Sequence, residues 1–316
     1  MTDTEYIALQ KSTIVRSNRQ SRLLRVARLG NATLSRVAPA LAARVAESLF
    51  VTPPRHRRPP AEVEMLARAC ARPMRVGARW IETWTWGTGP RVLLVHGWGG
   101  RGTQLGAFVP GLVARGFSVV TFDAPGHGAS DRRPVTMPEI TAALQQVAAA
   151  WGPVAGLIAH SGGALVATRA LYEGLDMGAA VYLAPAADLV GPALWFTETL
   201  GFPRAVRERM HRRIETRVGV PWTAFDVTAL APTLDTPLLI IHDRGDAEVP
   251  WQHGAAVGAA WPGAELLTTD GLGHRRILRA PDVVTAAVTF IAETANRGTR
   301  SLRARDVVEP STALAH

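Results

Sequence analysis

The chain has 316 residues, 47% of them hydrophobic, which is enough for one large domain with an appendage or for two small domains. No apolar run approaches the ~18–20 residues of a membrane span, and the charged N-terminus lacks the ~7–15-residue apolar core of a secretory signal. The single cysteine, Cys70, excludes an intrachain disulfide and suits a reducing compartment, so we expect a cytoplasmic protein.

The net charge of +9 belongs to the first part of the chain. Residues 1–75 carry 14 Lys and Arg against 5 Asp and Glu, whereas residues 76–316 carry 21 of each sign. Arginines cluster in residues 53–60, but no aromatic side chains alternate with them to stack on bases. We therefore do not expect nucleic-acid binding.

Residues 1–73 are expected to form a basic helical extension that ends in a stiff, Pro/Arg-rich linker over residues 53–60. Apolar residues recur there at spacings of three and four, which indicates one face of a helix: Leu34, Val37, Leu41, Val45 and Leu49. Pro39 marks a kink or a helix start. We expect the apolar face to pack on the body of the protein. Contact with an anionic membrane surface is the alternative that we favour less.

Short apolar runs alternate with helical patterns between residues 74 and 296. Strands are expected at 80–86, 92–95, 117–123, 154–159 and 179–183, and helices at 139–151 and 162–173. This alternation predicts an α/β fold with a mostly parallel, doubly wound sheet and functional residues at the carboxyl ends of the strands. The polar tail, residues 297–316, is expected to be disordered.

Ser161 stands between a buried strand and a segment of good helix formers. A turn this sharp lifts the hydroxyl clear of the sheet edge and requires small residues two positions away, which Ala159 and Gly163 provide. The start of the helix adds unpaired backbone N–H groups near the hydroxyl. Ser161 is therefore a candidate nucleophile, although the tripeptide alone also fits a plain polar turn.

The loop after the strand 92–95 allows two interpretations. Gly97, Gly99 and Gly102 fit the G-x-G-x-x-G pattern of a dinucleotide site, and Asp123 follows at about the ~20 residues that would reach a ribose. Alternatively, a backbone N–H after His-Gly turns toward a developing oxyanion.

The turn at residues 123–130 reads Asp-Ala-Pro-Gly-His-Gly-Ala-Ser. Together with the His-Gly-Trp loop it resembles the α/β-hydrolase family, and the resemblance extends from about residue 80 to residue 291. It implies an α/β-hydrolase fold with Ser161 as nucleophile, and Ala159 stands where the family usually has Gly. It also implies that the dinucleotide pattern is accidental.

The same resemblance assigns the base and the acid. His274, in the sequence Gly-Leu-Gly-His after the last strand, matches the family's catalytic histidine. Asp246 matches the acid after the strand ending in His242, where Asp243 is a second choice and Glu248 a third. The chain order Ser, Asp, His is the order found in α/β-hydrolases.

These assignments predict a serine hydrolase of the carboxylesterase type, acting on a small acyl ester through an acyl-enzyme on Ser161. The backbone N–H groups of Trp98 and Gly162 would hold the oxyanion. No metal or organic cofactor is expected. The alternatives are an acyltransferase with the same triad and a dinucleotide-binding oxidoreductase that uses the glycine loop.

An insertion at about residues 189–234 is expected to form a lid. Its aromatic residues are candidates for an acyl pocket or for the lid's own core: Trp195, Phe196, Phe202, Trp222 and Phe225. Six arginines between residues 204 and 217 would bind an anionic head group or, as we favour, lie on a solvated helix face.

Overall fold

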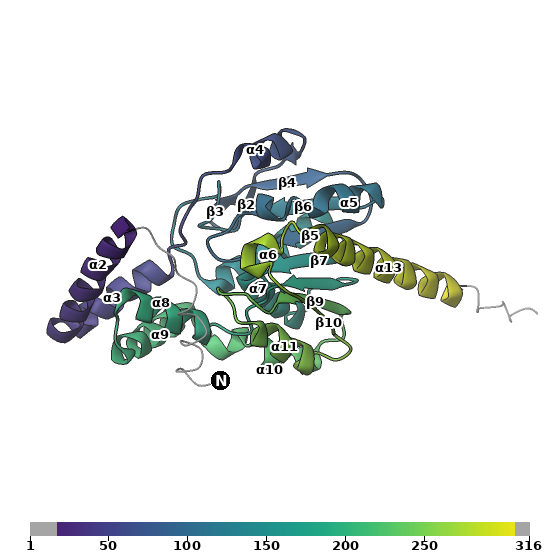
Figure 1. Ribbon diagram of the computed structural model, residues 1–316. Helices are drawn as coiled ribbons and strands as arrows, with labels where there is room; N and C mark the ends of the chain where they lie inside the picture. Colours follow the sequence, from purple (N-terminus) through teal and green to yellow (C-terminus); the bar gives the residue numbers. More distant parts are fainter. Residues whose placement is uncertain (1–17, 307–316) are drawn as a thin grey trace, which may run out of the picture.

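The computed structural model describes residues 18–306, with side chains described from residue 22 to residue 295. An eight-stranded sheet runs through the molecule in the order β1-β4-β6-β5-β7-β8-β9-β10 (Figure 1). The strands are β1 (Cys70–Ala71), β4 (Thr83–Trp86), β5 (Arg91–Val95), β6 (Ser118–Phe122), β7 (Val154–His160), β8 (Ala180–Leu183), β9 (Leu238–Asp243) and β10 (Glu265–Thr269). β4 is antiparallel to β1 and β6, and the strands from β6 to β10 are parallel to one another.

Helices cover both faces of the sheet, as expected for strands that are apolar on both sides. The helices α6 (Met137–Trp151), α7 (Gly162–Tyr172) and α11 (Trp251–Ala260) share one buried cluster with the sheet. The helices α5 (Phe108–Ala114) and α13 (Pro281–Asp306) share the other. The predicted α/β-hydrolase fold is thus confirmed.

The strand predicted at residues 80–86 is in fact two strands. β3 (Arg79–Ile81) pairs with β2 (Met74–Val76) in a small separate sheet, and only β4 joins the main sheet. The break falls at Glu82, whose N–H donates to Ser130 Oγ and whose carbonyl accepts from the Asp123 N–H. The backbone of Glu82 is therefore bound to the turn at residues 123–130 instead of to a strand.

The N-terminal segment is part of a helical cap. The helices α2 (Asn18–Val37) and α3 (Pro39–Phe50) form a hairpin that contacts α8 (Val190–Leu200) and α9 (Arg204–Val218) beside the main sheet (Figure 1). The predicted apolar face is correct only in part. Leu34 and Val45 pack against the core, whereas Val37, Leu41 and Leu49 are exposed. The fully buried apolar side chains of α3 are alanines (Ala42, Ala43, Ala46). Because the chain leaves helical geometry between α2 and α3, the predicted residues do not share one face.

Glu47 fastens the hairpin to the arginine-rich helix. Its buried carboxylate accepts from Arg213 at 2.6 Å and pairs with Arg217 at 2.8 Å. These two arginines therefore hold α3 against α9, which neither prediction for this helix had included. The remainder of the insertion forms short helical segments: η3 (Trp222–Phe225), α10 (Val227–Leu230) and η4 (Ala231–Thr233).

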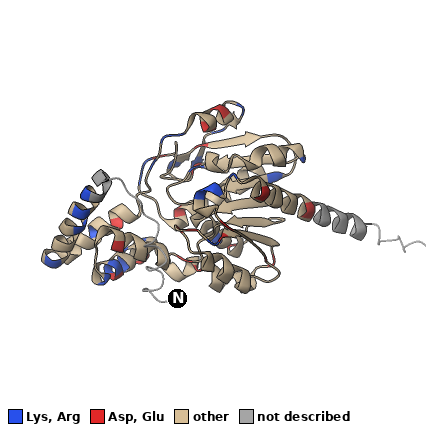
Figure 2. Cartoon of the chain, viewed as in Figure 1, with Lys and Arg blue, Asp and Glu red and all other residues tan. Residues whose placement is uncertain are grey.

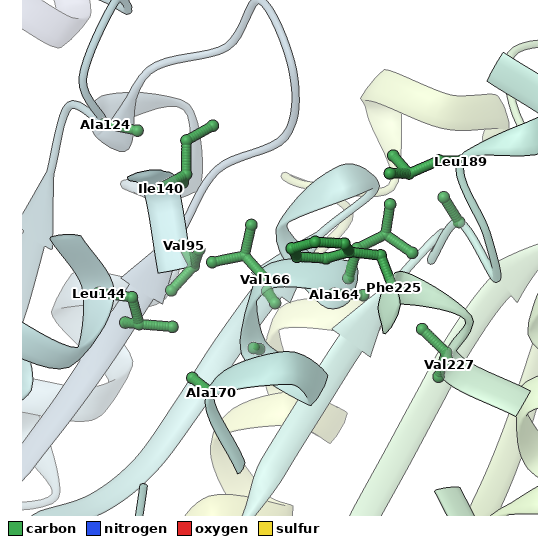
Figure 3. Close-up of a cluster of buried hydrophobic side chains, with 14 of the residues drawn as sticks. Val95, Ala124, Ile140, Leu144, Ala164, Val166, Ala170, Leu189, Phe225 and Val227 are labelled. Carbon is green, nitrogen blue, oxygen red and sulfur yellow. The ribbon is translucent and has the colours of Figure 1, made fainter. Parts of the chain in front are cut away.

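The core of the cap is continuous with the main core. Figure 3 shows Val166 beside Val95, and Phe225 from the insertion beside Ala164 of α7, with Leu189 in the same buried cluster. The insertion is thus packed onto the helix that follows Ser161.

The predicted linker is bound along the body of the protein. Arg55 donates to the backbone carbonyls of His127, Gly128, Ser130 and Asp131, and Arg58 forms an ion pair with buried Asp123.

The body itself begins earlier than the predicted boundary at residue 74. α4 (Pro60–Ala67) contacts the loop after β5, where its Glu62 pairs with Arg101, and β1 already belongs to the main sheet.

The predicted C-terminal boundary at residues 296/297 falls inside α13, which ends at Asp306. Residues 307–316, the end of the predicted tail, lie outside the described residues. Within residues 18–306, none of the helices combines the length and apolar character that crossing a membrane would demand.

Replacing Arg55 tests whether this segment is structural. We expect Arg55→Ala to lower the free energy of unfolding by about 2 kcal/mol, because backbone carbonyls of the turn lose a charged donor. Denaturant unfolding measures the change. Arg57→Ala, at an exposed neighbouring arginine, is the matched control and should stay within ~0.5 kcal/mol of the parent. Equal stability of the two variants would contradict the structural role.

Candidate active site

Ser161 lies at the carboxyl end of β7, immediately before the first turn of α7. Its backbone has φ 54° and ψ −123°, a region that side-chain-bearing residues rarely adopt and that costs on the order of 1–3 kcal/mol. The Ser161 N–H donates to Leu183 O at 3.0 Å, and the Ser161 carbonyl accepts from Ala164 N at 3.0 Å. The strained turn is therefore held by β8 on one side and by α7 on the other.

Two glycines make room for this turn. A Cβ atom at Gly163 would lie 2.8 Å from the carbonyl oxygens of Val95 and His96, so α7 could not start this close to β5 with any other residue. A Cβ atom at Gly97 would lie 2.9 Å from Ser161 Cβ and 3.4 Å from Ser161 Oγ. The loop after β5 thus passes directly over the serine side chain.

His274 and Asp246 come from the ends of two neighbouring strands and meet in a buried hydrogen bond. His274 Nδ1 donates to Asp246 Oδ2 at 2.7 Å. This bond fixes the tautomer and leaves His274 Nε2 as the acceptor of the ring. His274 lies in the short helix α12 (Gly273–Arg276) instead of the predicted loop.

His160 holds His274 beside the nucleophile turn. The His160 Nε2 donates to the backbone carbonyl of His274 at 3.0 Å, and the two ring centroids are 4.5 Å apart. Burial, followed by the charge of His274, lowers the pKa of His160 well below its ordinary value. His160 is therefore a neutral donor, and it anchors α12 to the residue that precedes Ser161.

Asp246 is buried but well supplied with donors. Its Oδ1 accepts from Glu248 N at 2.8 Å and Val249 N at 2.9 Å, and His242 Nε2 lies 3.4 Å from its Oδ2. Burial would raise the pKa of Asp246, but the hydrogen bonds from His242 and His274 hold it well below its ordinary value. The carboxylate is thus charged and can stabilise a cationic His274.

Asp243, at the position where a glycine is more usual, binds the two loops together. Its Oδ2 accepts from Leu272 N at 2.8 Å and Thr269 Oγ1 at 2.9 Å, and its Oδ1 accepts from Gly245 N at 3.0 Å. Burial would raise the pKa of Asp243, but these backbone donors lower it overall. Asp243 therefore ties the loop that carries Asp246 to the loop that carries His274, and it is not the residue bonded to the histidine.

The loop between β5 and η2 (Gly102–Leu105) brings a backbone N–H to the start of α7. A Cβ atom built on Gly162 would lie 3.6 Å from Trp98 N, so the two predicted oxyanion donors belong to adjoining segments. His96 fixes the loop, since its Nε2 accepts from Ala124 N at 2.9 Å and its Nδ1 donates to Gly97 O at 2.8 Å.

The dinucleotide interpretation conflicts with the position of Asp123. Its carboxylate is fully buried, accepts from Gly102 N at 2.9 Å and Ala129 N at 2.6 Å, and pairs with Arg58. None of this side chain is available to a ribose hydroxyl. Gly99 in turn faces Pro54, because a Cβ atom there would lie 2.9 Å from the proline ring.

Aromatic side chains connect this loop to the cap. Phe50, at the end of α3, stacks on Trp222 with centroids 5.5 Å apart and on Trp98 at 6.4 Å. It also meets Phe196 edge-on at 5.2 Å. Of the other pocket candidates, Trp195 is exposed, whereas Phe202 and Phe225 are buried in the core.

Phe50, Asp243 and the Arg55–Arg58 segment are the residues that sequence reasoning missed in these roles. An acid in place of a glycine marked Asp243 as unusual, although not its partners, and no sequence signal linked Arg58 to Asp123, which lies 65 residues away. No periodicity marks Phe50, because its neighbours come from three separate segments.

A family model described as "Alpha/beta hydrolase family" matches residues 92–287. A pimeloyl-(acyl-carrier protein) methyl ester esterase of Xanthomonas campestris pv. campestris (strain B100) is 29% identical over 252 residues, which cover 65% of this chain and 96% of that protein. The enzyme of the same description from Methylococcus capsulatus is 35% identical over 126 residues, which cover 39% of this chain and only 42% of that protein.

Solved structures share the fold at lower identity. An esterase of Thermogutta terrifontis has a TM-score of 0.54 at 20% identity and covers 72% of this chain and 100% of its own. A bromoperoxidase of Bacillus anthracis has a TM-score of 0.55 at 19% identity, and the match covers 71% of this chain and 100% of the bromoperoxidase chain.

Removing the charge of Asp243 tests its positioning role. We expect Asp243→Asn to lower kcat for ester hydrolysis about 10- to 100-fold with little change in KM. The amide replaces one of the two acceptor oxygens by a donor, so the bonds to Gly245 N and Leu272 N cannot both be kept and the His274 loop moves relative to Ser161. Asp270→Asn, at an exposed carboxylate paired with Arg244, is the control and should leave both constants unchanged. A rise in KM at constant kcat would contradict the positioning role.

Proposed function

Because the chain belongs to the alpha/beta hydrolase family, we propose that it hydrolyses carboxylic esters through an acyl-enzyme on Ser161. The observation that carries this proposal is the buried hydrogen bond between His274 Nδ1 and Asp246 Oδ2, which leaves the ring's Nε2 to act as a base. The strained backbone of Ser161 at the start of α7 supports the role of nucleophile.

In the proposed acylation step, His274 Nε2 takes the proton of Ser161 Oγ as the oxygen attacks the ester carbonyl carbon. The carbonyl π electrons move to oxygen, and the backbone N–H groups of Trp98 and Gly162 bind this oxyanion. Asp246 stabilises the imidazolium without taking its proton. Collapse of the tetrahedral intermediate breaks the bond to the alcohol oxygen, which leaves with the proton from His274.

In the proposed deacylation step, His274 Nε2 removes a proton from water as the water oxygen attacks the acyl carbon on Ser161. The second tetrahedral intermediate uses the same oxyanion donors. When it collapses, Ser161 Oγ leaves with the proton from His274, and a carboxylic acid is released. The low pKa of Asp246 keeps a carboxylate beside the imidazolium in both steps.

For the substrate we propose a small ester with an apolar acyl group. The related proteins named for a methyl ester esterase activity favour a small alcohol portion. The aromatic cluster of Phe50, Trp98, Phe196 and Trp222 beside the oxyanion loop offers apolar surface to an acyl chain. Its polar neighbour His211, which stacks on Trp222 at 3.9 Å, has its pKa lowered to about 4 by burial and is neutral at pH 7.

Removing the hydroxyl tests the nucleophile. We expect Ser161→Ala to lower turnover of p-nitrophenyl acetate on the order of 10⁴-fold or more and to abolish labelling by a fluorophosphonate. Ser48→Ala, at an exposed serine of α3, is the control and should retain both. Labelling of Ser161→Ala at the parental rate would overturn the proposal. Product analysis with added alcohols separates hydrolysis from acyl transfer.

Shortening Phe50 tests the acyl pocket. We expect Phe50→Ala to lower kcat/KM for p-nitrophenyl octanoate about tenfold or more and to change the acetate value little, because a long chain loses apolar contact. Leu49→Ala, at the exposed neighbouring residue, is the matched control. An equal loss for the octanoate and the acetate would contradict a role in chain selection.

A further inference from the structure

The outward half of α2 is aliphatic. Leu23, Val26, Leu29 and Val37 are 67%, 68%, 71% and 80% exposed. At about 100° per residue these four positions fall on one half of the helix. Four exposed large aliphatic side chains on one half of a single helix are unusual on a protein that is in contact with water alone.

The inward half of the same helix is mixed: Leu34 packs against the main core, and polar side chains make the specific contacts with α8. Asn31 Nδ2 donates to Leu200 O at 2.8 Å, and the buried Ser35 Oγ donates to Asn31 O at 2.6 Å. A Cβ atom at Gly201 would lie 2.9 Å from the backbone of Arg28, so α2 and the end of α8 are in close contact. A helix that packs on its own protein normally turns its apolar side inward. Here four large aliphatic side chains point outward instead, and the contacts with α8 fix that orientation.

Arginines flank the aliphatic face. Arg22, Arg25 and Arg36 are exposed on α2, and the first acidic residue after Arg22 is Glu47, which is buried and paired. Arg209 and Arg212 are exposed on neighbouring α9. Figure 2 shows this concentration of basic residues, coloured blue, along α2 and α9 at the cap end of the molecule.

We propose that the outward face of α2 docks on an anionic membrane surface. The aliphatic side chains enter the boundary of the acyl region, and the arginines bind lipid phosphates at the level of the head groups. Because α2 is held to α8 and, through α3, to α9, the cap side of the protein faces the bilayer. This docking goes beyond the proposed ester hydrolysis and does not depend on it.

Two observations favour a lipid surface over a protein partner. Recognition of an acidic protein needs the arginines but leaves the four exposed aliphatic side chains unexplained. Pairing with a second copy through the same face would bring arginines against arginines, which costs energy by like-charge repulsion. A bilayer of anionic lipids satisfies both kinds of side chain at different depths.

The test is co-sedimentation of the full chain with vesicles of phosphatidylcholine alone or mixed with phosphatidylglycerol. We expect binding to the mixed vesicles only, and weakening at high salt. Arg22→Glu/Arg25→Glu/Arg36→Glu should weaken vesicle binding roughly 100-fold or more, since each arginine near such a surface contributes about fivefold. Leu23→Ser/Val26→Ser/Leu29→Ser leaves the net charge unchanged and should weaken binding to the mixed vesicles about tenfold or more.

Matched controls carry the same changes elsewhere on the surface. Arg75→Glu/Arg115→Glu/Arg279→Glu has the same net charge as the first variant, and Val63→Ser/Leu266→Ser/Leu267→Ser removes the same kind of exposed side chain. Both should bind the mixed vesicles within about twofold of the parent. Circular dichroism and thermal unfolding check that every variant is folded.

Three outcomes would overturn the proposal. The first is a parental chain that ignores the mixed vesicles. The second is vesicle binding that depends on the arginines but not on Leu23, Val26 and Leu29, with soluble poly-glutamate bound as tightly as the vesicles. That result would assign the face to an acidic protein partner. The third is a parental dimer that the serine variant converts to a monomer without loss of vesicle binding, which would assign the face to a second copy.

Discussion

Three buried carboxylates hold the loops at the carboxyl edge of the sheet, and the geometry of the site depends on them. Asp123 joins the loop after β5 to the turn after β6, and Asp243 joins the loops after β9 and β10. Asp246 accepts a hydrogen bond from His274. Each accepts backbone N–H groups that would otherwise be buried without a partner. Because a buried carboxylate is costly unless it is fully hydrogen-bonded, these bonds favour one arrangement of the loops over others.

The strain at Ser161 is tolerated because its surroundings are rigid on every side. β5 and β7 pair along their length, Gly163 brings α7 against the end of β5, and Gly97 brings the next loop over the serine. Placing α7 this close to the sheet leaves its first N–H groups free to bind an anion. The same close packing that raises the energy of the turn therefore creates the electrostatic environment that acyl chemistry requires.

The cap is assembled from segments far apart in sequence. Glu47 of α3 pairs with Arg213 and Arg217 of α9, and Phe50 lies between the insertion and the loop after β5. The N-terminal hairpin thus forms one wall of the aromatic cluster near Ser161. The cap carries both the proposed acyl-binding surface and the proposed membrane-docking face. Docking through α2 would therefore turn the proposed ester-binding side toward the membrane.

The resemblance to the α/β-hydrolase family singled out Asp246 and His274 in the sequence. The sequence by itself determined the alternation of strands and helices and the strand–turn–helix around Ser161. Those features are local, since hydrophobic periodicity and turn residues act within a few positions. Only the tertiary structure decided which residues of the N-terminal helices are buried, that Asp243 and Arg58 bind distant loops, and that Phe50 joins the aromatic cluster. These outcomes depend on contacts between residues separated by tens to hundreds of positions, and periodicity along the chain carries no information about which surfaces will meet.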